Sequence, residues 1–310
     1  MLYGETTHSR GEMQDLCGKP RKSGSLPKTG DNPSGYLGPD AARGREVESR
    51  NPETAQGVSA MPELFQDAKS KIKWANQHIH ELNGKLSEFL QPDAYSLAVK
   101  HNPDAGIYVL TFTMTKPVPD EIQLRLGDIL HHLRTVLDYV AVELVERAGG
   151  STKHVKFPVR ANREELEAAL NGGEIKVAGS DIVTLILNVI QPYQRGNGDS
   201  IFVLHSLDIG DKHFRLTPII SVAALTHVHG RAGPATFTDC AFGVDAGGKV
   251  NVLAMPGKFE FQGYGQPAFA VSFGKGQPFE GQAIIPTLHQ LAQLVAGTVE
   301  AIEQVVLASA

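Results

Sequence analysis

Residues 127–138 carry the side chains of this chain that are best suited to chemistry. At about 100° per residue they predict a helix with one apolar face, and ionisable groups gather on a second stripe. That stripe consists of Asp128, His131, Arg134 and Asp138. Residues 126–142 contain no Lys and no Glu, although a solvated helix face is normally rich in both. The pattern therefore predicts short ionisable side chains held in fixed positions.

A second polar segment, residues 205–215, is the expected partner of this stripe. It contains His205-x-x-Asp208 and then Asp211-Lys212-His213. A pocket between the two segments would bind a small anionic or metal-bound ligand, with Arg134 and Lys212 holding the anion. The predicted ligand-binding residues are Asp128, His131, Arg134, Asp138, Asp211, Lys212 and His213. The catalytic candidates are His131, Arg134, Asp138 and His213, of which the two histidines would transfer protons.

The same residue types also allow a metal site. Asp128-x-x-His131 places a carboxylate and an imidazole one helical turn apart, as in the Glu-x-x-His pairs of bundle metalloproteins, and His205-x-x-Asp208 repeats the pair in reverse. A divalent metal is the one cofactor that the pattern suggests. The H-x-H pair His227 and His229 lacks a supporting ligand, so we expect half-exposed histidines at a strand end.

A structural interpretation explains these residues equally well. Asp128 or Asp138 could form buried ion pairs with the cations near residue 212, so that the whole set locks one helix to another. The protein would then be a structural or interaction protein. The sequence leaves both interpretations open, and with them the question of whether the protein is an enzyme.

Composition excludes several classes of function. The net charge is -5, which argues against broad binding to nucleic acid or to an anionic membrane. Two distant cysteines form no disulfide framework, which favours the cytoplasm, and no apolar stretch is long enough to predict a membrane span. P-loop, Rossmann, nucleophile-elbow and zincin motifs are absent.

The periodicity predicts an α+β fold in which a helical layer with a long central helix packs on a mostly antiparallel sheet. Residues 1–60 are rich in Gly and Pro and poor in apolar residues, so we expect a disordered extension, with Met61 as an alternative native start. Residues 61–310 should form one domain. The expected helices cover about 64–90, 120–148, 163–172, 181–190, 199–212 and 286–306. The expected strands are a hairpin over 95–115 and a meander over 217–273. The long first and last helices would suit a homodimer as well as a core.

Several short motifs resemble an uncharacterised family of bacterial proteins that is common in actinobacteria. They are the 127–138 segment, Phe157-Pro158, Gln191-Pro192-Tyr193, Asp211-Lys212-His213 and Phe273-Gly274. The family pattern reads GDxxHNLRSxLDH and DKHR, whereas this chain has His132, Tyr139 and Phe214 at variant positions. The resemblance implies no activity.

A weaker resemblance is to the HEPN helical ribonucleases, whose R-x(4–6)-H motif acts on RNA without a metal. Arg134 stands at the arginine position here, but Tyr139 replaces the histidine. Arg147 and His154 have the right spacing but straddle a Gly-Gly helix end. A metal-independent ribonuclease is therefore a further alternative.

Overall fold

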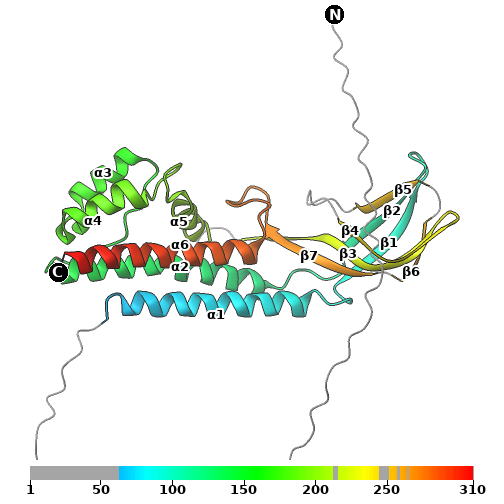
Figure 1. Cartoon of the computed structure of the whole chain (residues 1–310), viewed down its shortest axis with the longest axis horizontal. Coiled ribbons are helices and arrows are strands. Elements are labelled where there is room, and N and C mark those ends of the chain that lie inside the picture. Colours follow the sequence, from blue (N-terminus) through cyan, green and yellow to red (C-terminus); the bar gives the residue numbers. More distant parts are fainter. Residues whose placement is uncertain (1–62, 212–215, 244–250, 257–258, 264, 310) are drawn as a thin grey trace, which may run out of the picture. The chain divides into compact units, whose positions relative to one another are not determined.

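The computed structural model describes residues 63–211, 216–243, 251–256, 259–263 and 265–309, all within one compact unit, Pro62–Ala310. The predictions for residues 1–60 and for Met61 as the start fall outside the described residues. The described chain has an α+β fold, as predicted, with helices α1 to α6 and two antiparallel sheets (Figure 1).

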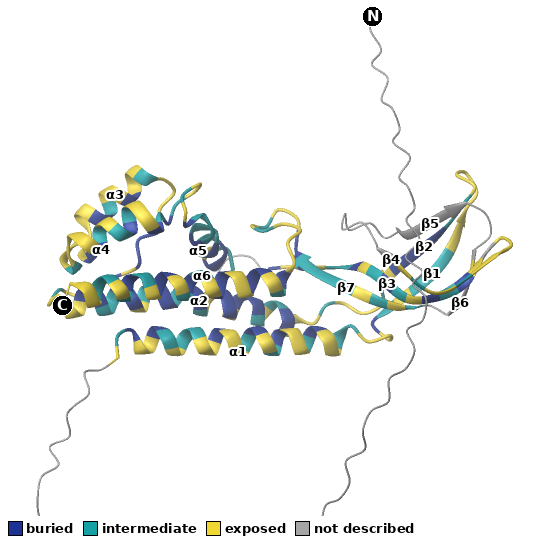
Figure 2. Ribbon diagram, in the orientation of Figure 1, coloured by how far each residue is buried: buried dark blue, intermediate teal, exposed yellow. Residues whose placement is uncertain are grey.

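Three long helices lie side by side in the helical part of the fold (Figure 1). They are α1 (Gln66–Phe89), α2 (Asp120–Arg147) and α6 (Ile284–Ala308). Exposed residues recur along α1, which buries one stripe of its surface (Figure 2). α2 buries more of its circumference, because it contacts α1, α5 and α6. The polar groups of α2 must therefore be accommodated among packed neighbours.

Short helices follow α2 in the chain. They are α3 (Arg163–Gly172), a 3-10 turn (Glu174–Ala178), α4 (Ser180–Leu185), a π-helical turn (Ile186–Ile190) and α5 (Asp199–Asp211). Asn162 caps α3: its side-chain oxygen accepts from Glu165 N at 2.9 Å, and its amide donates to Glu165 Oε1 at 2.8 Å. Asn followed three residues later by Glu is a typical helix-start pattern. The helix expected over 181–190 is instead divided between α4 and the π-helical turn.

The loop after the π-helical turn holds one end of the segment 154–160. Gln191 takes a left-handed conformation (φ 51°), and Pro192 cannot continue a helix. Arg160 N then donates to Pro192 O at 3.2 Å, and Gln194 N donates to Ala161 O at 3.3 Å. These backbone hydrogen bonds hold the end of the 154–160 segment against the loop.

The strands form two sheets. In the first, β1 (Tyr95–Asn102) and β2 (Ile107–Met114) make the predicted hairpin, and β5 (Asn251–Pro256) pairs with β2. In the second, β3 (Pro218–Ala232) pairs with β4 (Ala235–Gly243), β6 (Phe259–Gly263) and β7 (Gln266–Phe273). Every pairing is antiparallel.

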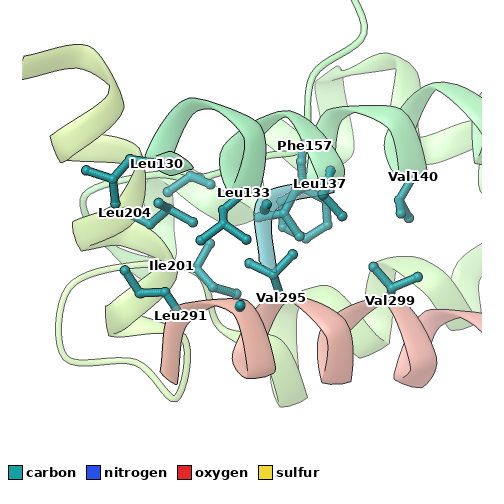
Figure 3. Packing of buried hydrophobic residues seen from close by; sticks show 14 of the residues in the cluster. Leu130, Leu133, Leu137, Val140, Phe157, Ile201, Leu204, Leu291, Val295 and Val299 are labelled. Atoms are coloured by element: carbon teal, nitrogen blue, oxygen red, sulfur yellow. The ribbon is translucent and has the colours of Figure 1, made fainter. Parts of the chain in front are cut away.

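The buried apolar residues separate into two clusters. The larger one joins α1, α2, α5, α6 and the loop residue Phe157, and Figure 3 shows its centre. The smaller one lies between the sheets and contains Leu110 and Phe112 of β2 with Val222, Leu225 and Val228 of β3. The sheet residues thus pack mainly on one another, and the end of β7 supplies Phe273 to the helical cluster. The fold therefore has two sheets that share a small core of their own, whereas the prediction was one sheet packed under a helical layer.

Helix α6 is, among the described residues, the one helix that is long and apolar enough to cross a membrane. The sequence had suggested no such span. One face of α6 is buried in the helical cluster through Leu288, Leu291, Val295, Val299 and Ile302. A core helix can meet the same length and composition criteria as a membrane span.

Candidate functional site

Helices α2 and α5 are joined by three pairs of facing residues. Gly127 lies against Asp211, His131 against Asp208 and Arg134 against His205. Residue numbers rise along α2 as they fall along α5, so the two helices run antiparallel. The predicted contact between the α2 stripe and the start of the 205–215 segment is present for His131 and Arg134. Lys212 and His213, the other predicted ligands there, lie outside the described residues.

Arg134 is the most buried charged residue of this contact, with 4% of its surface exposed. Its Nε donates to His205 Nδ1 at 3.1 Å, its Nη1 to Asp138 Oδ1 at 2.7 Å and its Nη2 to the carbonyl oxygen of Phe157 at 3.1 Å. Three of its five N–H groups therefore join three segments of the chain. Such a charge can be buried because it is both paired and hydrogen-bonded.

Asp138 completes the attachment of Phe157. Its Oδ1 accepts from Phe157 N at 2.8 Å as well as from Arg134. The Phe157 ring is 1% exposed and packs in the helical core near Leu137 (Figure 3). Phe157 is thus fixed by its backbone N–H, its carbonyl and its ring, and the extended segment around it is held rigidly beside α2.

The protonation state of His205 follows from its contact with Arg134. Because Nδ1 accepts the Arg134 N–H, the ring is neutral and its proton lies on Nε2. Burial lowers the pKa of His205, and the positive charge of Arg134 lowers it further; Asp208 and Asp138 oppose this shift, and Arg160 adds the smallest lowering effect. Every buried side-chain polar atom of the described residues has a partner. No protein partner of His205 Nε2 is found among the described residues, so this nitrogen is in contact with solvent.

His131, a catalytic candidate, forms the exposed member of a second polar pair. Its Nδ1 donates to Asp208 Oδ1 at 2.7 Å; the His131 side chain is 56% exposed and that of Asp208 only 8%. Its Nε2 lies 3.5 Å from the Thr135 hydroxyl, which donates to the His131 carbonyl at 2.8 Å. Asp208 therefore orients an imidazole whose other nitrogen is close to solvent.

Asp128 does not face α5, contrary to the prediction. It is exposed and lines a hollow with His78, Glu121, Leu124 and Arg125 on the side of α1. The reason is helical geometry: each step of three residues turns a position back by about 60°, so Asp128 and Arg134 lie about 120° apart around α2. One neighbouring helix cannot contact both.

The four predicted metal ligands consequently do not form one cluster. Asp128 points away, His131 and Asp208 bind each other, and His205 accepts from Arg134. Among the described residues, no group of three or more His, Cys, Asp or Glu side chains is placed to hold a metal ion. The metal interpretation of these residues thus lacks geometric support.

The two histidines of the H-x-H pair contact Asp239 on β4. His227 Nδ1 lies 2.8 Å from Asp239 Oδ1, and Asp239 N donates to His229 Nδ1 at 3.2 Å. Both members of the first pair are more than half exposed. They do not mark a strand end as expected, because β3 continues to Ala232 through its pairing with β4.

Arg134 and His205 also line a basic pocket of about 250 Å³. We use the name basic pocket for the cavity lined by Arg134, His154, Val155, Lys156, Phe157, Pro158, Val159, Arg160, Ala169, Gly173, Glu174, Ile175 and His205. Of the described residues predicted to bind a ligand, Arg134 alone lines it; His205, proposed as a metal ligand, lines it too. The rest of its described lining comes from residues 154–160 and from Ala169, Gly173, Glu174 and Ile175, and residues 212–215, which bound the predicted pocket, lie outside the described residues.

The sequence carries a signal for this segment. Residues 154–160 read His-Val-Lys-Phe-Pro-Val-Arg, in which His154, Lys156 and Arg160 are exposed and the residues between them are buried. The alternation of basic and apolar residues over 154–157 indicates a segment with a basic outer face. Pro158 also gives the segment the pattern of an ordinary loop, which hides this signal.

The residue pairs that suggested a ribonuclease do not share a pocket. Arg134 lines the basic pocket, whereas Tyr139 lines a separate hollow with Glu143. Five helical residues turn the position by about 140°, which separates the two side chains. Arg147 and His154 also line different hollows.

No protein-family model, no curated protein and no solved structure matches this chain. Its function must therefore be inferred from the geometry and charge of the site itself.

Proposed function

We propose that this protein binds a small anion in the basic pocket. The observation that carries the proposal is the charge of the lining: among the described residues, Arg134, Lys156 and Arg160 are cationic and Glu174 alone is acidic. The whole chain has a net charge of -5. A local concentration of positive charge in a concave surface of an acidic protein attracts anions and focuses the field on the cavity.

The attachment of the 154–160 segment supports the same proposal. Phe157 is held by Arg134 and Asp138, and Arg160 N by the Pro192 carbonyl, so the middle and the C-terminal end of the basic segment are fixed. A site whose donors are already positioned loses less conformational entropy when a ligand binds. We place this binding in the cytoplasm, because a sequence with two cysteines far apart suits a reducing compartment.

Calorimetric titration with sulfate, phosphate and acetate at constant ionic strength tests the proposal. The variant Lys156→Gln/Arg160→Gln should bind the preferred anion at least tenfold more weakly than the wild type. Lys153→Gln is the matched control, because Lys153 is exposed on the same loop but does not line the pocket. Absence of saturable binding, or equal losses in both variants, would refute the proposal.

A structural role is the second candidate, and the hydrogen bonds of Arg134 favour it. Those bonds join α2 to α5 and to Phe157 whether or not a ligand is present. If this role is the whole function, Arg134→Met should lower stability strongly while no anion raises the melting temperature of the wild type.

The ribonuclease alternative has a separate test. If the protein is a ribonuclease, incubation of the purified wild type with a labelled RNA should yield cleavage products, and Arg134→Ala should yield none. Circular dichroism must show that the variant is folded. Persistence of the products in the folded variant would assign them to a contaminant.

A further inference from the structure

We infer that the basic pocket is built for a small phosphate monoester; this inference rests on the proposed anion binding and specifies its ligand. The competing ligand class is a carboxylate. The arrangement of donors, the size of the cavity and the nature of its walls distinguish the two.

The donors come from three separate elements. Arg134 belongs to α2, His205 to α5, and Lys156 and Arg160 to the extended segment. A carboxylate is planar and is recognised best by one bidentate arginine fork. Arg134 already donates three of its N–H groups to the protein, including the one on Nε. Donors that approach from several directions suit the oxygens of a tetrahedral phosphoryl group.

His205 adds a neutral donor to these cations. Its Nδ1 is occupied by Arg134, so the ring can offer only the N–H of Nε2, which reaches solvent. Lys156 contributes an ammonium group, the point charge that phosphate sites commonly use. Asp138 pairs with Arg134, so the positive charge that the described lining offers to a ligand comes mainly from Lys156 and Arg160, against the one carboxylate of Glu174.

The volume and walls limit what the phosphoryl group can carry. About 250 Å³ is below the roughly 300–1,000 Å³ of pockets that hold drug-sized ligands. The remaining lining is largely apolar and includes Val155, Val159, Ala169 and Ile175. A short organic group would contact this wall while the phosphoryl oxygens meet the cations.

Calorimetry with four probes tests the inference at pH 8, where a phosphate monoester with a second pKa of about 6 is a dianion. The probes are ethyl phosphate, dimethyl phosphate, propionate and a short RNA, each at the same ionic strength. Ethyl phosphate should bind at least tenfold more tightly than dimethyl phosphate or propionate. Lys156→Gln should lower its affinity about tenfold, and Lys153→Gln should not change it.

Each contrary result has its own meaning. Equal or tighter binding of propionate would overturn the phosphate inference while leaving the proposed anion binding intact. Tighter binding of dimethyl phosphate or of the RNA would overturn it in favour of a phosphodiester. Binding of none of the probes, with no response to the anions of the earlier titration, would overturn both proposals.

Discussion

Replacement of Gly127 by alanine tests how closely α5 packs on α2. Gly127 is buried in the middle of α2, and a Cβ added there would lie 2.3 Å from Asp211 Oδ2 and 2.7 Å from Asp211 Cγ. Gly84, in α1, provides a matched control, because a Cβ there meets nothing within 4 Å. Both glycines lie inside long helices, so the intrinsic gain from alanine is similar at the two positions.

The expected magnitudes follow from two opposing effects. Alanine in a helix interior is favoured over glycine by about 0.8–1.0 kcal/mol. Overpacking a filled contact costs about 1–3 kcal/mol. The atoms that the new Cβ would meet all belong to the end of the half-buried Asp211 side chain, which can turn aside, so the cost at Gly127 should lie near the lower end of that range. Gly84→Ala should therefore raise the free energy of unfolding by about 1 kcal/mol, and Gly127→Ala should lower it by about 0–1 kcal/mol. At roughly 2–4 °C per kcal/mol for a domain of this size, the melting temperatures should differ by about 2–8 °C.

Urea unfolding monitored by circular dichroism would measure both variants. A double-mutant cycle of Gly127→Ala with Asp211→Ala isolates the clash, because the cost of losing the other contacts of Asp211 cancels. In the Asp211→Ala background, alanine at 127 should recover its helical advantage. If Gly127→Ala stabilises the wild type as much as Gly84→Ala does, the predicted packing of Asp211 on α2 is wrong.

Three further predictions concern the same contact and its surroundings. Arg134→Met should lower the free energy of unfolding by about 3–5 kcal/mol, since it leaves Asp138 and the Phe157 carbonyl without their buried partner; a loss below 1 kcal/mol in urea unfolding would contradict the network. His131→Ala should cost no more than about 1 kcal/mol in the same assay, because the imidazole is more than half exposed; a loss as large as that of Arg134→Met would show a buried role. Stability should also fall as the pH drops below about 6.5, because burial lowers the pKa of both His205 and His132 in the folded protein, so the unfolded chain binds protons that the folded chain excludes. His132→Gln, which removes the ring that accepts from Lys71 at 3.2 Å, should flatten this dependence, and an unchanged slope between pH 5 and pH 7 would exclude His132 as a contributor.

The sequence by itself determined the α+β class, the helices α1, α2, α3 and α6 and the β1–β2 hairpin. These features depend on local periodicity and on turn and cap residues, which are readable without a partner. The absence of Lys and Glu from residues 126–142 likewise identified Arg134 and Asp138 as unusual. The burial of Arg134 and its ion pair with the half-buried Asp138 explain the choice of these two residues.

Only the tertiary structure decided which residues meet. The pairing of Arg134 with His205, the outward position of Asp128 and the place of the basic pocket all depend on the rotation and register of α5 and the 154–160 segment against α2. That register is set by the packing of residues far apart in the chain, such as Phe157 on the helical core. Helical spacing constrains which residues share a face, but it carries no information about which neighbour covers that face.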